Sequence, residues 1–155
     1  MQTQEKGKMT SSGYNELVGF VKKGNWQIFG TLTFRYNVDL RQAEKSLNTF
    51  WNIIDRKLFG NLSHRKNIRT KRICVLQKGK LNNHNHIHFV ANTVEGVKIE
   101  DFILILKYFW LQKLKHTGEQ IKIDKIKNLE ATSKYLLHEY YKLGTNTLAL
   151  TCSNT

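Results

Sequence analysis

The sequence predicts an α+β fold in which a central antiparallel β-sheet of four to five strands is flanked by helices. Two observations predict this class. Short stretches rich in β-branched and aromatic residues alternate with stretches whose apolar residues recur at helical spacing. Their order is β-α-β-β-α-β-α, which implies an antiparallel sheet with helices packed on one side.

Each predicted strand has a local justification. The first, WQIFGTLTFRY, is rich in aromatic and β-branched residues. The second and third flank the loop KGKLNN, whose glycine and two asparagines are turn formers. The fourth has isoleucines at alternate positions, 121 and 123. The four strands are predicted over residues 26–36, 70–77, 84–92 and 120–126.

The helices are predicted from apolar spacing and from their end signals. Asp39 can cap the longest helix, whose apolar periodicity continues until Gly60 and Asn61 end it. The next helix is apolar around most of its circumference, so we expect it to be well buried. Gly144 closes the last one. The helices are predicted over residues 40–59, 98–115 and 129–143, and residues 14–23 are expected to form a short helix or a lead-in.

The length of 155 residues fits a single domain with a substantial core. We divide the chain into an N-terminal arm and lead-in (1–25), the folded domain (26–144) and a C-terminal tail (145–155). The tail is polar apart from residues 148–150, which could add an edge strand.

Composition excludes several classes of protein. The longest apolar run, Phe102 to Leu106, is far shorter than the roughly 20 residues of a membrane span, and the polar N-terminus does not resemble a signal peptide. Two cysteines cannot form a disulfide framework, so we expect a reduced, intracellular, cytoplasmic setting. The net charge of +13, from 25 Lys and Arg against 12 Asp and Glu, indicates a polyanionic partner.

The positive charge is concentrated between Arg56 and Lys80, where nine Lys or Arg residues occur without any Asp or Glu. Such a segment could hold a phosphate backbone. The alternative is a solvated surface with surplus basic residues. The candidate DNA-binding residues are Arg65, Lys66, Arg69, Lys71, Arg72, Lys78 and Lys80.

Three histidines, His84, His86 and His88, occupy alternate positions of the third predicted strand. Alternate residues share one face of a strand, and the apolar residues between and after them face the other way. Two imidazoles separated by one residue can chelate one divalent ion and leave coordination positions open. The alternative is a histidine-rich edge strand without a ligand.

The last predicted helix places Tyr135, His138 and Lys142 along one stripe, separate from the stripe that should be buried. This cationic surrounding favours a phenolate and stabilises a nearby phosphate, as a tyrosine nucleophile requires. The alternative is that Tyr135 is an ordinary surface residue and Tyr140 a core residue.

Together, the motifs TLTF (31–34), His-Ile-His (86–88) and a late helical tyrosine, Tyr135, resemble the HUH endonuclease superfamily, in particular its rolling-circle replication initiator (Rep) branch. The resemblance covers about residues 26–143. It implies an RRM-like, or ferredoxin-like, nuclease fold.

The resemblance also implies a reaction and its partners. His86 and His88 would bind Mn²⁺ or Mg²⁺ at the scissile phosphate of single-stranded DNA. Tyr135 would attack that phosphate and become linked to its 5′ end, with His138 and Lys142 beside it. The basic segment would hold the strand or an origin hairpin, and a replication helicase is a possible further partner.

The chain departs from the family pattern at the third metal ligand. Many Rep proteins have a Glu where this chain has Gln77. Its amide oxygen can coordinate a hard cation but without a charge, so metal affinity should be lower. His84 or Glu139 could complete the coordination shell instead.

A second departure concerns the helix. The family often has Lys three residues after the tyrosine, where this chain has His138, which could instead shuttle protons. The position of a second catalytic tyrosine is Glu139, so a single-tyrosine enzyme is expected. Tyr140 and Tyr141 are the rival nucleophiles.

Two other functions remain open from the sequence. One is a transposase or relaxase of the same superfamily with the same chemistry. The other is a non-catalytic, RRM-like nucleic-acid-binding module, in which Trp26, Phe29 and Phe34 would stack on bases. The sequence has no GxxxxGK[ST] loop with which to drive unwinding by ATP.

Overall fold

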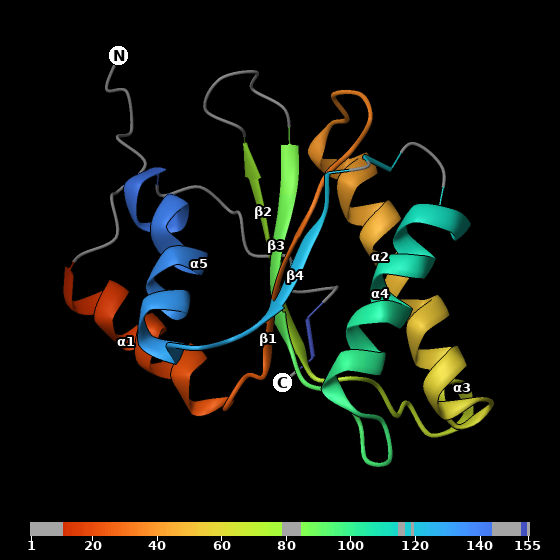
Figure 1. Ribbon diagram of the computed structural model, residues 1–155. Helices are drawn as coiled ribbons and strands as arrows, with labels where there is room; N and C mark the ends of the chain where they lie inside the picture. The colour runs from red at the N-terminus through yellow and green to blue at the C-terminus, as the bar shows by residue number, and fades with distance from the viewer. Residues whose placement is uncertain (1–10, 79–84, 115–116, 119, 144–152, 155) are drawn as a thin grey trace.

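The structure, a computed structural model, describes residues 11–78, 85–114, 117–118, 120–143 and 153–154. It confirms the predicted α+β class: four antiparallel strands in the order β2-β3-β1-β4 are flanked by helices (Figure 1). The strands are β1 (Ile28–Leu32), β2 (Arg72–Lys78), β3 (Asn85–Ala91) and β4 (Lys122–Lys125). The helices are α1 (Ser11–Lys23), α2 (Leu40–Phe59), α3 (Leu62–Arg65), α4 (Ile99–Lys113) and α5 (Leu129–Leu143).

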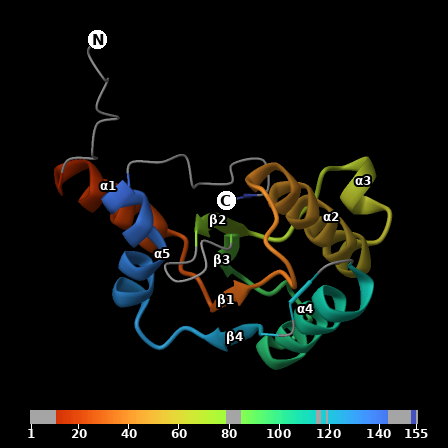
Figure 2. The same cartoon turned by 90° about the horizontal axis from the view of Figure 1, so that it is seen from above.

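Helices cover both faces of the sheet, α2 and α4 on one face and α1 and α5 on the other (Figure 2). The prediction of helices on one side was therefore wrong. The reason lies in β2, where Cys74 and Leu76 join the core under α2 and α4 while Ile73 and Val75 join the core under α1 and α5. A strand that is apolar on both faces needs a covering layer on each.

The larger core, between the sheet and helices α2 and α4, is built from aromatic rings. Phe50 packs edge-on against Trp110 with ring centroids 5.3 Å apart, and Trp51 against Phe89 at 5.5 Å. Such edge-to-face pairs add stability beyond the burial of their area. This core makes the sheet a rigid support for side chains on its opposite face.

Helix α2 has the predicted bounds because its end signals are strong. The Asp39 side chain accepts a hydrogen bond from the Gln42 backbone N–H at 2.7 Å. Gly60, at φ 59°, ends the helix, and its N–H donates to the Arg56 carbonyl. A non-glycine residue at that φ would be strained.

Helix α4 differs from the prediction of burial around most of its circumference. Phe102, Leu106 and Trp110 are fully buried, but Leu104 and Tyr108 are 64% and 51% exposed. One face of α4 packs on the sheet, and the opposite face is on the surface. The described residues contain no helix with the length and apolar character needed to cross a membrane.

The described residues nearest to each end of the chain contact the folded domain. Helix α1 begins within the predicted arm, at Ser11, and its Tyr14 hydroxyl donates to the Lys134 carbonyl of α5 at 3.1 Å. Near the C-terminus, Asn154 forms an antiparallel bridge with Arg72 at the outer edge of β2. Residues 148–150, predicted as an edge strand, lie outside the described residues.

Candidate functional site

The histidines of β3 lie on the sheet face that α1 and α5 cover. Ile87 and Phe89 belong to the core on the α2 and α4 side, so His86 and His88, which alternate with them, project to the other side. The alternation predicted from the sequence therefore places both imidazoles beneath α5, in an enclosed layer of the protein.

The two imidazoles converge on one point. Their Nε2 atoms are 3.1 Å apart, and the ring planes are nearly perpendicular at 87°. Two neighbouring ligands of an octahedral cation, with bonds of about 2.1 Å, lie about 3 Å apart. The spacing of the two Nε2 atoms therefore fits joint coordination of one divalent ion.

Thr31 of β1 fixes the orientation of the His88 ring. The strand register pairs Thr31 with His88, and the threonine Oγ1 lies 2.9 Å from the His88 Nδ1. If Nδ1 carries the proton and donates it to Oγ1, Nε2 is the unprotonated nitrogen; here it lies within hydrogen-bond distance of the His86 Nε2, and it is the atom that would bind a metal instead. Sequence reasoning placed Thr31 in a motif but not in the site, because the β1–β3 register is a long-range feature.

His88 is neutral over the whole physiological range. Burial and, to a smaller extent, charge repulsion from the nearby His86 together lower its pKa to about 3. Its ring also stacks on Phe29, with centroids 5.5 Å apart and planes 20° from parallel. A neutral imidazole in a fixed orientation is the form that binds metal without proton competition.

Tyr135 lies on α5, the helix that covers this face of the sheet, and its ring contacts His88. Its ring centroid is 5.5 Å from that of His88 and 5.7 Å from that of Phe29. Leu136 and Leu137, the next two residues, are fully buried and hold α5 against the sheet. Tyr135 itself is 59% exposed, so a ligand can approach its ring from solvent.

Gln77 of β2 completes the group. The register pairs Gln77 with His86, the side chain is buried, and its Nε2 donates to the Leu136 carbonyl of α5 at 3.3 Å. This bond occupies the amide nitrogen and leaves the amide oxygen, which is the atom that can coordinate a hard cation.

The side chains of the other two candidate metal ligands, His84 and Glu139, cannot be placed. Within the described part of the chain, no three His, Cys, Asp or Glu side chains are grouped to hold a metal ion. His84 lies outside the described residues, and so does the side chain of Glu139. Two imidazoles and one amide oxygen still fit a divalent cation that keeps open positions for water or substrate.

The other catalytic candidates can be placed only by backbone. His138 and Lys142 belong to α5, as do the rival nucleophiles Tyr140 and Tyr141, but their side chains lie outside the described ones.

The sequence prediction did not include Lys122 of β4. The register puts Lys122 opposite Thr31, on the same sheet face as His88, where alternation on β4 would have indicated it.

The basic segment is partly on the surface and partly in the core. Arg65, Lys66, Arg69 and Lys71 are exposed, as a DNA contact requires. The side chain of Lys78 and all of Lys80 lie outside the described residues. Arg72 was predicted to contact DNA, and that prediction was wrong because Arg72 is 2% exposed.

Arg72 has a structural role instead. Its Nη1 donates to the Asp55 Oδ2 at 2.9 Å, and its guanidinium lies over the Trp51 ring, 4.8 Å from the centroid. Thr70 donates from its backbone N–H and its hydroxyl to the Asp55 Oδ1 at 2.9 and 2.8 Å. The buried charge is thus paired and hydrogen-bonded, which offsets its desolvation.

Comparison of the chain with protein-family models, with curated proteins and with solved structures finds no match. The geometry of the site is therefore the basis for assigning a function.

Proposed function

We propose that the chain is a metal-dependent, sequence-specific endonuclease that nicks and rejoins single-stranded DNA through a covalent bond to Tyr135, and that it initiates rolling-circle replication of a plasmid or virus. One observation supports this most directly. The solvent-exposed Tyr135 ring lies 5.5 Å from the ring of His88, and the Nε2 of His88 lies 3.1 Å from that of His86. The ring of the proposed nucleophile thus contacts the ring of one member of the proposed chelating pair.

In the proposed reaction, the Tyr135 hydroxyl oxygen attacks the phosphorus of one phosphodiester. An O–P bond to Tyr135 forms and the P–O3′ bond breaks, while the tyrosine loses a proton and the departing 3′ oxygen takes one up. The phosphotyrosine conserves the bond energy, so a 3′-hydroxyl can reverse the step and rejoin the strand.

The residues around Tyr135 have supporting roles. His86 and His88, with the Gln77 amide oxygen, would hold Mn²⁺ or Mg²⁺, which when bound supplies positive charge to the phosphate and the leaving oxygen. Thr31 orients His88. Phe29 packs against both His88 and Tyr135 and thereby fixes their relative position.

The alternative function, a non-catalytic RRM-like nucleic-acid-binding module, requires aromatic rings that are exposed to bases, and the structure gives this requirement less support. Trp26 and Phe34 are 5% and 8% exposed, and the Trp26 Nε1 donates to the Val21 carbonyl. Phe29 is stacked on His88. These three rings are engaged inside the protein, whereas an RRM-like platform presents its rings to bases.

The test is covalent attachment to DNA. The protein is mixed with a pool of randomised single-stranded DNA and Mn²⁺, and the products are separated by denaturing gel electrophoresis. We expect a protein–DNA band that is absent with EDTA, in Tyr135→Phe and in His86→Ala. Tyr36→Phe is the matched control, because Tyr36 is 61% exposed and lies outside the site.

The outcomes separate the alternatives. An adduct that persists in Tyr135→Phe would transfer the role to Tyr140 or Tyr141, and cleavage that is undiminished in His86→Ala would contradict the metal assignment. Sequencing the attached strands would identify the target site. DNA binding without any adduct, over a pool that covers all targets, would favour the binding module.

A further inference from the structure

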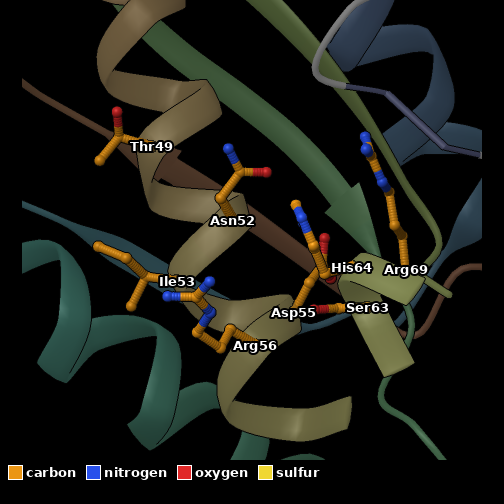
Figure 3. Close-up of a pocket in the computed structure, with 8 residues that line it drawn as sticks. All are labelled: Thr49, Asn52, Ile53, Asp55, Arg56, Ser63, His64 and Arg69. Atoms are coloured by element: carbon orange, nitrogen blue, oxygen red, sulfur yellow. The ribbon is translucent and has the colours of Figure 1, made fainter. Parts of the chain in front are cut away.

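A polar pocket lies in the helical layer on the side of the sheet opposite to Tyr135. Its volume is about 540 Å³, and it is formed by α2, α3 and the segment that leads into β2 (Figure 3). Because α2 covers one face of the sheet and α5 the other, this pocket is separate from the tyrosine site. Its lining residues are Thr49, Asn52, Ile53, Asp55, Arg56, Ser63, His64 and Arg69.

The pocket has a cationic lining. In the view of Figure 3, His64 lies between the side chains of Arg56 and Arg69. The one acidic residue in the lining, Asp55, already accepts three hydrogen bonds from Thr70 and Arg72. Its charge is balanced by the buried Arg72, so the arginines at the rim determine the local potential.

These arginines are available for a ligand. Among the described residues, neither the Arg56 nor the Arg69 side chain forms an ion pair or a hydrogen bond, and both are exposed. Asn52, on the same side of α2 as Arg56, adds an amide donor. Figure 3 shows the two guanidinium groups on either side of His64, and each is a charged donor group that suits the oxygens of a phosphate.

We propose that this pocket binds a phosphate group of a nucleic-acid backbone, as a second DNA contact outside the cleavage site. The pocket is larger than a bare phosphate requires, and its size is in the range of nucleotide-sized ligands. Exposed Arg65 and Lys66 continue the positive surface beyond it, so a polymer of phosphates can extend from the pocket along the protein.

This inference depends on the proposed function for the identity of the polyanion as DNA, but not on cleavage. Its test therefore uses binding alone. The probe is a fluorescent 30-nucleotide single strand, measured by anisotropy in EDTA with Tyr135→Phe protein, so that no covalent step contributes. Affinity is measured over a series of salt concentrations.

We expect Arg56→Ala/Arg69→Ala to weaken binding on the order of tenfold near 0.1 M salt and to reduce the slope of log affinity against log salt by about 1.4. The control, Arg41→Ala/Lys45→Ala, removes the same charge from exposed positions of α2, the helix that carries Arg56, outside the pocket. It should change affinity less than about twofold, since it removes no phosphate contact.

Equal losses in the two double variants would overturn the proposal, because they would show a general effect of net charge. An unchanged affinity in Arg56→Ala/Arg69→Ala would overturn it as well. Arg56→Gln/Arg69→Gln repeats the measurement with longer side chains, and denaturant unfolding verifies that each variant is folded. If no covalent adduct forms but Arg56→Ala/Arg69→Ala weakens binding as expected, the proposed cleavage is rejected and the proposed phosphate binding in the pocket stands.

Discussion

The tautomer of His88 decides whether the two histidines can act together on a metal. Thr31 contacts the nitrogen concerned: its Oγ1 lies 2.9 Å from the His88 Nδ1, and in the tautomer with a proton on Nδ1 it accepts the hydrogen bond and leaves Nε2 unprotonated. A ligand whose second nitrogen is anchored binds metal more tightly, because its ring is already oriented and its Nε2 is unprotonated.

Thr31→Val should therefore weaken Mn²⁺ binding about 10- to 100-fold, the usual effect of losing such an outer contact. Valine keeps the β-branched shape and loses the hydroxyl. Isothermal titration of the metal-free protein with Mn²⁺ measures the change. Thr31→Ser, which keeps the hydroxyl, is the control, and equal affinity in the valine and serine variants would contradict this role.

The lowered pKa of His88 makes a prediction about acid stability. The folded protein keeps His88 neutral down to about pH 3, because burial and then His86 disfavour the cation, whereas the unfolded chain takes up the proton near its ordinary pKa of 6.5. The unfolded state thus binds more protons between these values, and the stability contributed by this group is lost as the pH falls from 6.5 towards 3.

His88→Asn removes this titration while retaining a donor for Thr31. Between pH 7 and pH 4 in EDTA, wild type should lose on the order of 3 kcal/mol more unfolding free energy than His88→Asn, as measured in urea. Glu100 and Glu130, whose carboxyl pKa values are also lowered by hydrogen bonds from lysines, are present in both proteins and cancel in the comparison. Parallel pH profiles for the two proteins would rule out the neutral, buried imidazole.

At the scale of elements, the join between α2 and β2 depends on one buried ion pair. Asp55 of α2 and Arg72 of β2 are both nearly inaccessible, and their side chains are 2.9 Å apart. Removing one partner leaves an uncompensated charge in the core.

Arg72→Met should cost about 3 to 5 kcal/mol of unfolding free energy, the range for breaking a buried pair from one side. Chemical denaturation measures it. Arg65→Met, on the exposed part of the same basic segment, should change stability by less than about 0.5 kcal/mol. A small effect at Arg72 would contradict this structural role.

The same pair shows why part of the basic segment could not be assigned from sequence. At the start of β2, nothing local distinguishes Arg72 from the preceding Lys71, since both follow a polar stretch. Only the long-range approach of Asp55 buries Arg72 and leaves Lys71 exposed.

In contrast, the bounds of α2 follow from Asp39 and Gly60, which act locally, and the sequence predicted them. Helix α3 was not predicted, because four residues are too few for a periodic apolar pattern.

At the scale of the whole molecule, the site exists because four elements meet. Thr31 comes from β1, Gln77 from β2, the histidines from β3 and Tyr135 from α5, and the sheet order with α5 folded over it brings them together. The sequence identified the histidines and the tyrosine by residue type and spacing. It did not predict helical layers on both faces of the sheet, although the two-sided apolar run of β2, from Ile73 to Leu76, was a signal for a second layer.

The central claim is that Tyr135, and no other tyrosine, forms the bond to DNA. Trypsin cleavage after Lys134 and Lys142 would release the peptide YLLHEYYK, which contains Tyr135, Tyr140 and Tyr141 together. The most direct measurement is fragmentation mass spectrometry of this peptide from the Mn²⁺ adduct after nuclease digestion of the DNA. We predict a nucleotide mass on Tyr135, whose ring centroid lies 5.5 Å from that of His88. A nucleotide on Tyr140 or Tyr141, or on a residue outside this peptide, would contradict it.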